Sequence, residues 1–195
     1  MDDLALARTP TLTPPVTLKT QRLILRPWQT SDLKPFAEMN ADSDVMRYYP
    51  SVLSTSESDE LAEKISARLS ENGWGFWALE LKQSGEFIGF TGLNKPGYDL
   101  PCNPCVEVGW RLSKKHWGKG YATEAAQASL QFAFEELNLD RVVSFASVVN
   151  TASWRVMERI GMRNTHSNFN HPIIPAGSPL SDHVLYEIKR SDWER

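Results

Sequence analysis

KKHWGKGYATE, residues 114–124, lies between a predicted strand and the strongest predicted helix of the chain. The segment before it, VEVGWRL at 106–112, alternates apolar and other residues, which is typical of a strand. From Ala122 to Leu137, small and apolar residues recur at spacings of three and four, which predicts a helix packed closely on a sheet. The valine-rich run 141–149 predicts a buried parallel strand. Residues 106–149 therefore form one right-handed strand–helix–strand crossover.

The loop at the start of this helix has the composition of an anion site. A helix begins with unpaired backbone N–H groups and a partial positive charge. Gly118 and Gly120 leave the backbone accessible, and Lys114, Lys115 and Lys119 add positive charge. The pattern matches neither a P-loop nor a dinucleotide fingerprint. We expect a phosphate-bearing ligand here; the alternative is that the two glycines only shape a turn.

The sequence before the crossover predicts an antiparallel meander. A strand signal occurs at 22–26, and three more, separated by turn signals, occur at 75–81, 87–93 and 106–112. Helices are expected after Ser31-Asp32 and after Ser54, which offer N-caps, and Glu124 is expected to face water because it falls off the apolar stripe of the main helix. Asn150 caps a further short helix, and 183–188 supplies a last strand. The fold class is α/β with a mixed sheet.

Domain organisation and composition limit the function classes. Residues 1–16 contain three prolines and are interpreted as a flexible arm, which leaves 17–195 as a single domain. The net charge of -3 disfavours a nucleic-acid binder, although the lysines of the loop keep that class as a minor alternative. No apolar run reaches the roughly 20 residues of a membrane helix, and no secretory signal is visible. A cytoplasmic protein is expected, with Cys102 and Cys105 as reduced thiols in a loop and no metal site.

Several motifs in order resemble the GNAT N-acetyltransferase superfamily, and within it the RimJ/RimL-type branch. Trp117-x-x-Gly120-x-Ala122 is similar to the acyl-CoA signature Q/R-x-x-G-x-G/A, with Trp117 in place of the usual glutamine or arginine. Further similar segments are TQRLILRP (20–27), VGW (108–110), NTAS (150–153), IGM (160–162) and HVLY (183–186). The resemblance implies a GNAT-like fold, in which strands 106–112 and 141–149 splay apart and pantetheine lies between them.

The resemblance also implies the contacts of acetyl-CoA, the expected cosubstrate. The pantetheine arm is expected along Trp110, Arg111 and Leu112, and near Asn150. The pyrophosphate is expected at Trp117, Gly118, Lys119, Gly120, Tyr121, Ala122 and Thr123, with the Trp117 indole as one donor. A backbone N–H near Gly109 or Trp110 is expected to bind the thioester carbonyl. Gly109 suits a bulge at that point, unless it is a simple packing glycine.

Three residues are candidates for catalysis. Ser153 is expected to donate to the leaving thiolate, and Asn150 to contact substrate, although Asn150 is also an excellent N-cap and Ser153 would be unremarkable in that role. Glu107 is the candidate general base, acting through water on an amine; the alternative is a solvated or salt-bridged strand carboxylate. His166, His171 and His183 show no triad or metal spacing.

The function expected from these features is transfer of acetyl from acetyl-CoA to a primary amine by direct attack. The branch favours a protein N-terminal α-amine, as in ribosomal proteins. The alternatives are a small-molecule amine such as an amino acid, polyamine or antibiotic, and a non-catalytic acyl-CoA sensor. The expected partners are therefore acetyl-CoA or CoA and the amine acceptor, without nucleic acid or membrane, and a homodimer is left open.

Overall fold

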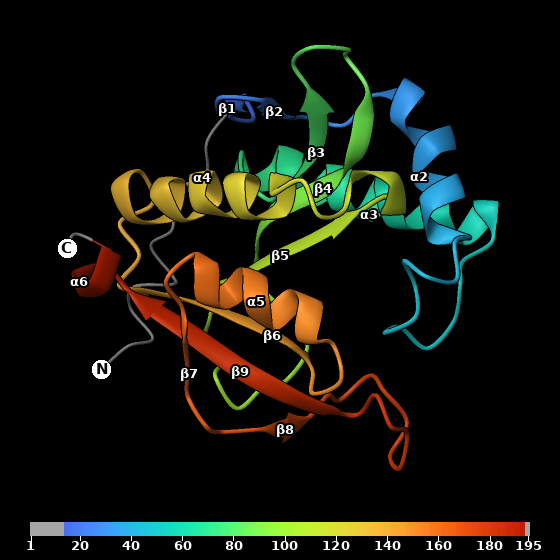
Figure 1. Cartoon of the computed structure of the whole chain (residues 1–195). Coiled ribbons are helices and arrows are strands. Elements are labelled where there is room, and N and C mark those ends of the chain that lie inside the picture. The colour runs from blue at the N-terminus through green and yellow to red at the C-terminus, as the bar shows by residue number, and fades with distance from the viewer. Residues whose placement is uncertain (1–13, 194–195) are drawn as a thin grey trace.

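The computed structural model describes residues 14–193 of the chain. In chain order the elements are β1 (Leu18–Lys19), β2 (Leu23–Arg26), η1 (Thr30–Asp32), α2 (Leu33–Asn40), α3 (Thr55–Asn72), β3 (Phe76–Leu81), β4 (Phe87–Asn94), β5 (Glu107–Leu112), η2 (Lys114–His116), α4 (Tyr121–Glu135), β6 (Arg141–Ser147), α5 (Thr151–Arg159), β7 (Arg163–Asn164), β8 (Phe169–Asn170), β9 (Asp182–Lys189) and α6 (Arg190–Trp193). The strands of the described residues form one mixed sheet in the order β1-β2-β3-β4-β5-β6-β9-β7, with β8 paired to β9 (Figure 1).

The predicted meander and crossover are confirmed. Strands β2 to β5 pair antiparallel with their sequence neighbours, and β5 pairs parallel with β6 across α4. The parallel contact has a single registered pair, Glu107 with Val143. Beyond it, β5 and β6 separate toward the end of the sheet where α4 begins (Figure 1). The predicted splay of the two central strands is therefore present.

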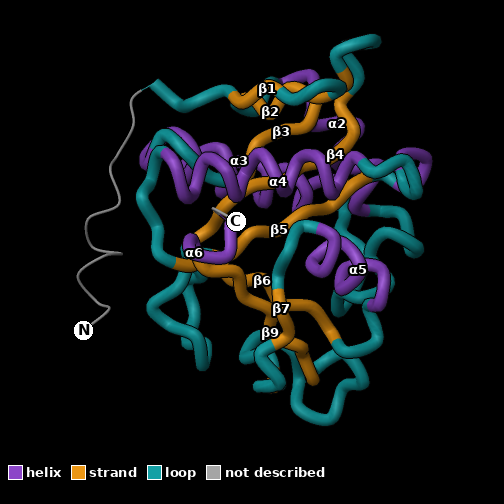
Figure 2. The backbone as a smooth tube through the Cα atoms, turned by 60° about the vertical axis from the view of Figure 1, so that its left-hand side comes forward, coloured by secondary structure: helices purple, strands orange, loops and turns teal. Residues whose placement is uncertain are grey.

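Helices cover both faces of this sheet. On one face, α4 and α5 pack with Val108, Leu112 and Val142 in the larger apolar core. On the other face, α2 and α3 pack with Ala78, Phe87 and Phe90 in a second core. Figure 2 shows the twisted sheet running between these helices. Alternation along β5 therefore points neighbouring side chains into two different environments.

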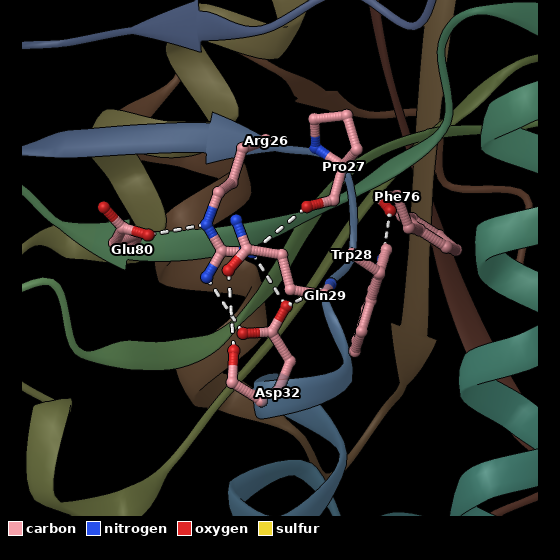
Figure 3. A network of polar contacts seen from close by, with 8 residues as sticks. Arg26, Pro27, Trp28, Gln29, Asp32, Phe76 and Glu80 are labelled. Atoms are coloured by element: carbon pink, nitrogen blue, oxygen red, sulfur yellow. Dashed lines mark hydrogen bonds and ion pairs between the residues drawn. The ribbon is translucent and has the colours of Figure 1, made fainter.

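A buried network of charges joins β2 to β3 and to the start of α2 (Figure 3). The Arg26 guanidinium donates to both carboxylate oxygens of Asp32, at 2.7 and 2.9 Å, and its Nε donates to Glu80 at 2.6 Å. Asp32 also accepts the backbone N–H of Gln29. Asp32 is the N-cap residue of α2, as predicted, but its side chain makes no capping hydrogen bond to that helix. It instead closes the capping box of the short 3-10 turn whose N-cap is Gln29.

The first turn of α4 is tied to the beginning of the sheet. Glu124, expected to face water, accepts from the Thr20 hydroxyl at 2.6 Å, the Arg22 backbone N–H at 2.8 Å and Arg22 Nε at 2.6 Å. The spacing of apolar residues along the helix could not predict these hydrogen bonds, because the partners of Glu124 lie about 100 residues earlier in the chain. A carboxylate in the first turn is also favoured by the helix dipole.

The predicted N-terminal arm lies mostly outside the described residues. Its last residue, Val16, donates its N–H to the Gly73 carbonyl at 2.8 Å and accepts from the Trp77 indole at 2.7 Å. Among the described residues, no helix combines the length and apolarity needed to cross a membrane.

Candidate functional site

The loop before α4 has an open backbone surface. Gly118 and Gly120 adopt positive φ angles of 73° and 80°, which favour glycine. A Cβ at Gly118 would meet nothing within 4 Å. Gly120 is the N-cap of α4 and provides no side-chain cap, so the first amides of the helix are left for solvent or a ligand. The geometry fits an anion placed on the helix N-terminus.

The charges around this loop are distributed differently from the expectation. Lys114 pairs with Asp44 at 2.5 Å and Lys115 pairs with Glu86, so both of these cations are already neutralised. Lys119 forms no ion pair within the described part of the chain. Of the three lysines, Lys119 therefore contributes the most available charge.

Arg22 braces the loop and was not singled out from the sequence. Its guanidinium donates to the Lys119 carbonyl at 2.9 Å and lies 4.5 Å from the centre of the Tyr121 ring. Its Nε also pairs with Glu124 at 2.6 Å. Arg22 belongs to the segment that carried part of the family resemblance, and that was its only signal in the sequence. We interpret it as a residue that positions the loop.

The indole N–H of Trp117 has a partner within the chain. Its indole N–H donates to the Leu112 carbonyl at 2.8 Å, while 45% of the residue surface is exposed. The bond closes the turn between β5 and the loop. The indole N–H is therefore already used within the chain, and the expected contact with phosphate stays a prediction.

The backbone of β5 presents its polar groups alternately to β4 and to the gap. The carbonyls of Val106 and Val108 turn toward β6, where they accept from Val143 N–H at 3.0 Å and Ser144 Oγ at 2.9 Å. Alternation places the N–H of Trp110 on this side as well. The Gly109 carbonyl instead accepts from Thr91 Oγ1 on β4, at 3.2 Å. Of the two expected amide donors, Trp110 is the one that faces the gap.

Gly109 has a packing role and no bulge. The register between β4 and β5 is unbroken from Gly89–Leu112 to Asn94–Glu107. A Cβ at Gly109 would lie 3.2 Å from the Phe76 ring, closer than a side chain normally packs. The expected bulge is therefore absent. Glycine is required at this position because the Phe76 ring approaches it closely.

Glu107 is buried at the start of the splayed region. Only 9% of its surface is exposed, and its Oε1 accepts from Asn94 Nδ2 at 2.6 Å. Arg68 in turn donates to Asn94 Oδ1 at 3.3 Å. Burial raises the pKa of Glu107 to about 7, against the smaller lowering by the Asn94 hydrogen bond and the Arg68 charge. The alternative of a solvated carboxylate is excluded by this burial.

One cavity brings the candidate catalytic residues together. It encloses about 700 Å³, and its walls include Glu107, Trp110, Arg111, Asn150 and Ser153. Asn150 caps α5, as expected, by accepting the Ser153 backbone N–H on its Oδ1 at 3.2 Å. The capping role of Asn150 is confirmed, whereas the substrate roles of Asn150 and Ser153 stay predictions.

Arg111 turns its side chain to the face covered by α2 and α3. Its Nη1 donates to Asn40 Oδ1 at 2.7 Å, and its guanidinium lies 4.1 Å from the centre of the Tyr49 ring. Trp110 and Leu112, by contrast, pack toward the core under α4. The three residues predicted to line pantetheine are thus divided between two faces of β5.

Two histidines that appeared scattered in the sequence meet in the same cavity. The rings of His171 and His183 are 4.8 Å apart, and both residues line the cavity. Burial lowers the pKa of His183, and burial with the neighbouring His183 lowers that of His171 to about 4, so both are neutral at pH 7. The pairing of β8 with β9 brings them together. The two residues of β8 are too few to leave a strand signature in the sequence.

Comparison with known proteins gives a consistent result. The model of the acetyltransferase (GNAT) domain family matches residues 22–163. An uncharacterized N-acetyltransferase, YnaD of Bacillus subtilis, is 31% identical over 90% of this chain and 98% of its own length. The FsC-acetyl coenzyme A-N(2)-transacetylase of Aspergillus fumigatus is 30% identical over 92% of this chain and 78% of its own.

A solved structure supports the same assignment. The GNAT-family acetyltransferase of Bacillus anthracis is 30% identical and superposes with a TM-score of 0.74 over 90% of this chain and 99% of its own. The splayed β5 and β6, the open glycine loop before α4 and these matches agree, and the chain belongs to the GNAT family of N-acetyltransferases.

Proposed function

We propose that this chain transfers acetyl from acetyl-CoA to a primary α-amine, with Glu107 as the general base. The observation that carries the proposal is the position of Glu107: a buried carboxyl with a pKa of about 7, in one cavity with Asn150 and Ser153. A base whose pKa lies near the working pH is suited to removing a proton from an attacking amine. An α-amine, with a pKa of about 8, is also partly neutral at pH 7.

The loop before α4 supports acetyl-CoA as the donor, which the family uses. Gly118, Gly120 and the first amides of α4 would hold the pyrophosphate, with Lys119 as the nearby cation. The amides of Trp110 and Leu112 face the gap in which the pantetheine would lie. Bound in this way, acetyl-CoA supplies the acetyl group as a thioester.

The residues of the chain then have distinct tasks. Glu107 accepts the proton that the amine loses as its nitrogen bonds to the acetyl carbon. The Trp110 N–H donates to the carbonyl oxygen, where negative charge develops. Ser153 Oγ donates to the sulfur as the carbon–sulfur bond breaks. One such hydrogen bond, worth about 1.5–3 kcal/mol when charge is involved, offsets the roughly 2 kcal/mol needed to release a thiolate at pH 7.

The acceptor is an α-amine on either a protein N-terminus or a small molecule. The cavity of about 700 Å³ has the size typical of small-ligand sites. A free amino acid, a dipeptide or the first residues of a protein would each present such an amine. A panel of N-terminal peptides, free amino acids and polyamines, assayed by release of free thiol, decides between these classes.

The test of the cofactor loop uses two variants that differ in one charge. Gly118→Asn and Gly118→Asp have nearly the same size and suffer the same positive φ, which both residues tolerate better than most. We expect Gly118→Asp to weaken CoA binding at least about tenfold more than Gly118→Asn, because a carboxylate repels the diphosphate. Equal affinities by calorimetry would show that no anion binds here. Tight CoA binding by the wild type without turnover of any amine would favour the sensor function instead.

A further inference from the structure

The cavity carries a local excess of positive charge. Its walls include four cationic side chains, Lys64, Arg68, Lys95 and Arg111, and two acidic ones, Glu71 and Glu107. The chain as a whole has a net charge of -3, so this excess is specific to the cavity. Glu107 is also partly protonated at neutral pH, because burial raises its pKa to about 7. The cavity is therefore better suited to a ligand that brings negative charge than to a polycation.

Arg111 is held in a fixed orientation within this cavity. Asn40, which is fully buried, accepts from its Nη1 at 2.7 Å, and the rings of Tyr49 and Phe90 lie 4.1 and 5.4 Å from its guanidinium carbon. Asn40 is itself fixed by donating to Ser58 at 2.9 Å. The guanidinium is thus oriented by an amide and by ring faces, none of which neutralises its charge.

The donors of Arg111 are not all used. Its Nε is buried and has no hydrogen-bond partner within residues 14–193. In the same range, no carboxylate lies within ion-pair distance of its guanidinium. An uncompensated charge costs free energy unless a ligand meets it. The planar fork of a guanidinium matches a carboxylate, which it can bind with two parallel hydrogen bonds.

The position of Arg111 on β5 relates it to the proposed base. Glu107, Gly109 and Arg111 share one face of the strand, and Gly109 places no side chain between the other two. At about 3.3 Å per residue, each of the two is roughly 7 Å along the strand from Gly109. The Phe76 ring packs over Gly109 and also lines the cavity. A small acceptor lying against this ring can therefore present its amine toward Glu107 and a second group toward Arg111.

We infer that Arg111 binds a carboxylate of the acceptor, so that the enzyme selects amines that carry a carboxylate a few bonds from the reacting nitrogen. This inference rests on the proposed function and names its substrate class. A terminal carboxylate of a small peptide and an acidic side chain at the second position of a longer chain share this chemistry. Polyamines, which bring only positive charge, are disfavoured acceptors.

The experiment uses two pairs of acceptors that differ in one charge and have nearly equal amine basicity. Alanyl-alanine and its amide place the carboxylate at the C-terminus, as in a small molecule. Alanyl-glutamate amide and alanyl-glutamine amide place it on a side chain, as at a protein N-terminus. In at least one pair, the wild type should prefer the charged member by about 10- to 100-fold in kcat/KM, the value of a hydrogen bond to a charged group. The pair that shows the preference identifies the source of the carboxylate.

Substitutions at Arg111 connect this preference to one side chain. Arg111→Gln should reduce the ratio within the pair to near one, and Arg111→Lys should keep an intermediate ratio, because it retains the charge and loses the fork. Arg163→Gln removes an exposed cation on β7, outside the cavity, and should leave the ratio unchanged. Thermal unfolding confirms that each variant is folded.

Binding separates a failure of this inference from a failure of the proposed function. The dipeptides are also titrated into CoA-saturated protein by calorimetry, which needs no turnover. A preference for the charged member that Arg111→Gln removes supports the inference even if no acetyl transfer is seen. Equal binding of both members in both pairs overturns it. The inference is also overturned if Arg111→Gln keeps the preference for the charged acceptor and loses affinity for CoA, because Arg111 would then bind the cofactor.

Discussion

Two arginines on the side of the sheet covered by α2 illustrate two uses of a buried charge. Arg26 donates two hydrogen bonds to Asp32 and a third to Glu80, so its charge is compensated by carboxylates of the protein itself (Figure 3). Arg111 meets the amide oxygen of Asn40 and the ring of Tyr49, and its Nε has no partner within the described residues.

The difference separates a structural site from a binding site. A guanidinium surrounded by carboxylates is a closed network, and its effect is to join β2, β3 and α2. A guanidinium held by neutral groups keeps its charge, so the surrounding fold fixes its direction and leaves the counter-charge to a ligand. The same reasoning applies to Glu107, a carboxylate whose bonded partner is the neutral amide of Asn94.

Breaking the network of Arg26, Asp32 and Glu80 should have the largest effect on the free energy of unfolding. Asp32→Ala removes one partner of a pair whose side chains are 10% and 1% exposed and leaves Arg26 with one carboxylate. Because an uncompensated buried charge is costly, we expect the free energy of unfolding to fall by about 3–5 kcal/mol. Urea denaturation measures the loss. The control is Asp44→Ala, which breaks an exposed pair with Lys114 and should change the value by less than about 1 kcal/mol.

Substitution of Glu107 in the cavity should have the largest effect on activity. Glu107→Gln keeps the size of the side chain and its bond to Asn94 but removes the proton acceptor. We expect kcat/KM to fall at least about 100-fold, the contribution of a positioned general base, while the affinity for CoA is retained. Free-thiol release and calorimetry measure the two quantities. A variant that retains the wild-type rate would identify Glu107 as a structural carboxyl and remove the base from the mechanism.

Regular elements were predictable from the sequence because their signals are local. The hairpins of the meander, the crossover, the open glycine loop before α4 and the Asn150 cap each depend on residues close together in the chain. Contacts between distant segments were not predictable. Glu124 contacts Arg22, and the side chain of Arg111 contacts Asn40, which lies 71 residues earlier in the chain. The meeting of His171 and His183 depends on a strand of only two residues.

The contribution of Glu107 to stability should depend on pH. The pKa of Glu107 is raised to about 7 in the folded chain, so the folded state binds a proton that the unfolded state has already released between pH 4.5 and 7. The contribution of Glu107 to stability therefore falls as the pH rises through this window, by an upper estimate of about 3 kcal/mol.

The comparison of wild type with Glu107→Gln isolates this contribution, because the lowered pKa values of His171 and His183 affect both proteins equally. Urea denaturation should show the variant gaining stability relative to wild type between pH 5 and pH 8. A difference that is constant with pH would mean that Glu107 titrates normally. In the same window, kcat/KM of the wild type should rise as Glu107 loses its proton and becomes able to act as a base.

The smallest expected effect concerns a donor that is satisfied within the chain, as Arg26 is. The Trp117 indole donates to the Leu112 carbonyl at 2.8 Å, so Trp117→Phe removes this bond and leaves an aromatic ring on the loop. We expect a loss of about 1 kcal/mol in the free energy of unfolding and a change of less than about threefold in CoA affinity. If the indole instead donated to the diphosphate, affinity would fall tenfold or more with little loss of stability. Calorimetry and urea denaturation of this one variant therefore decide whether the indole N–H stabilises the turn or binds the ligand.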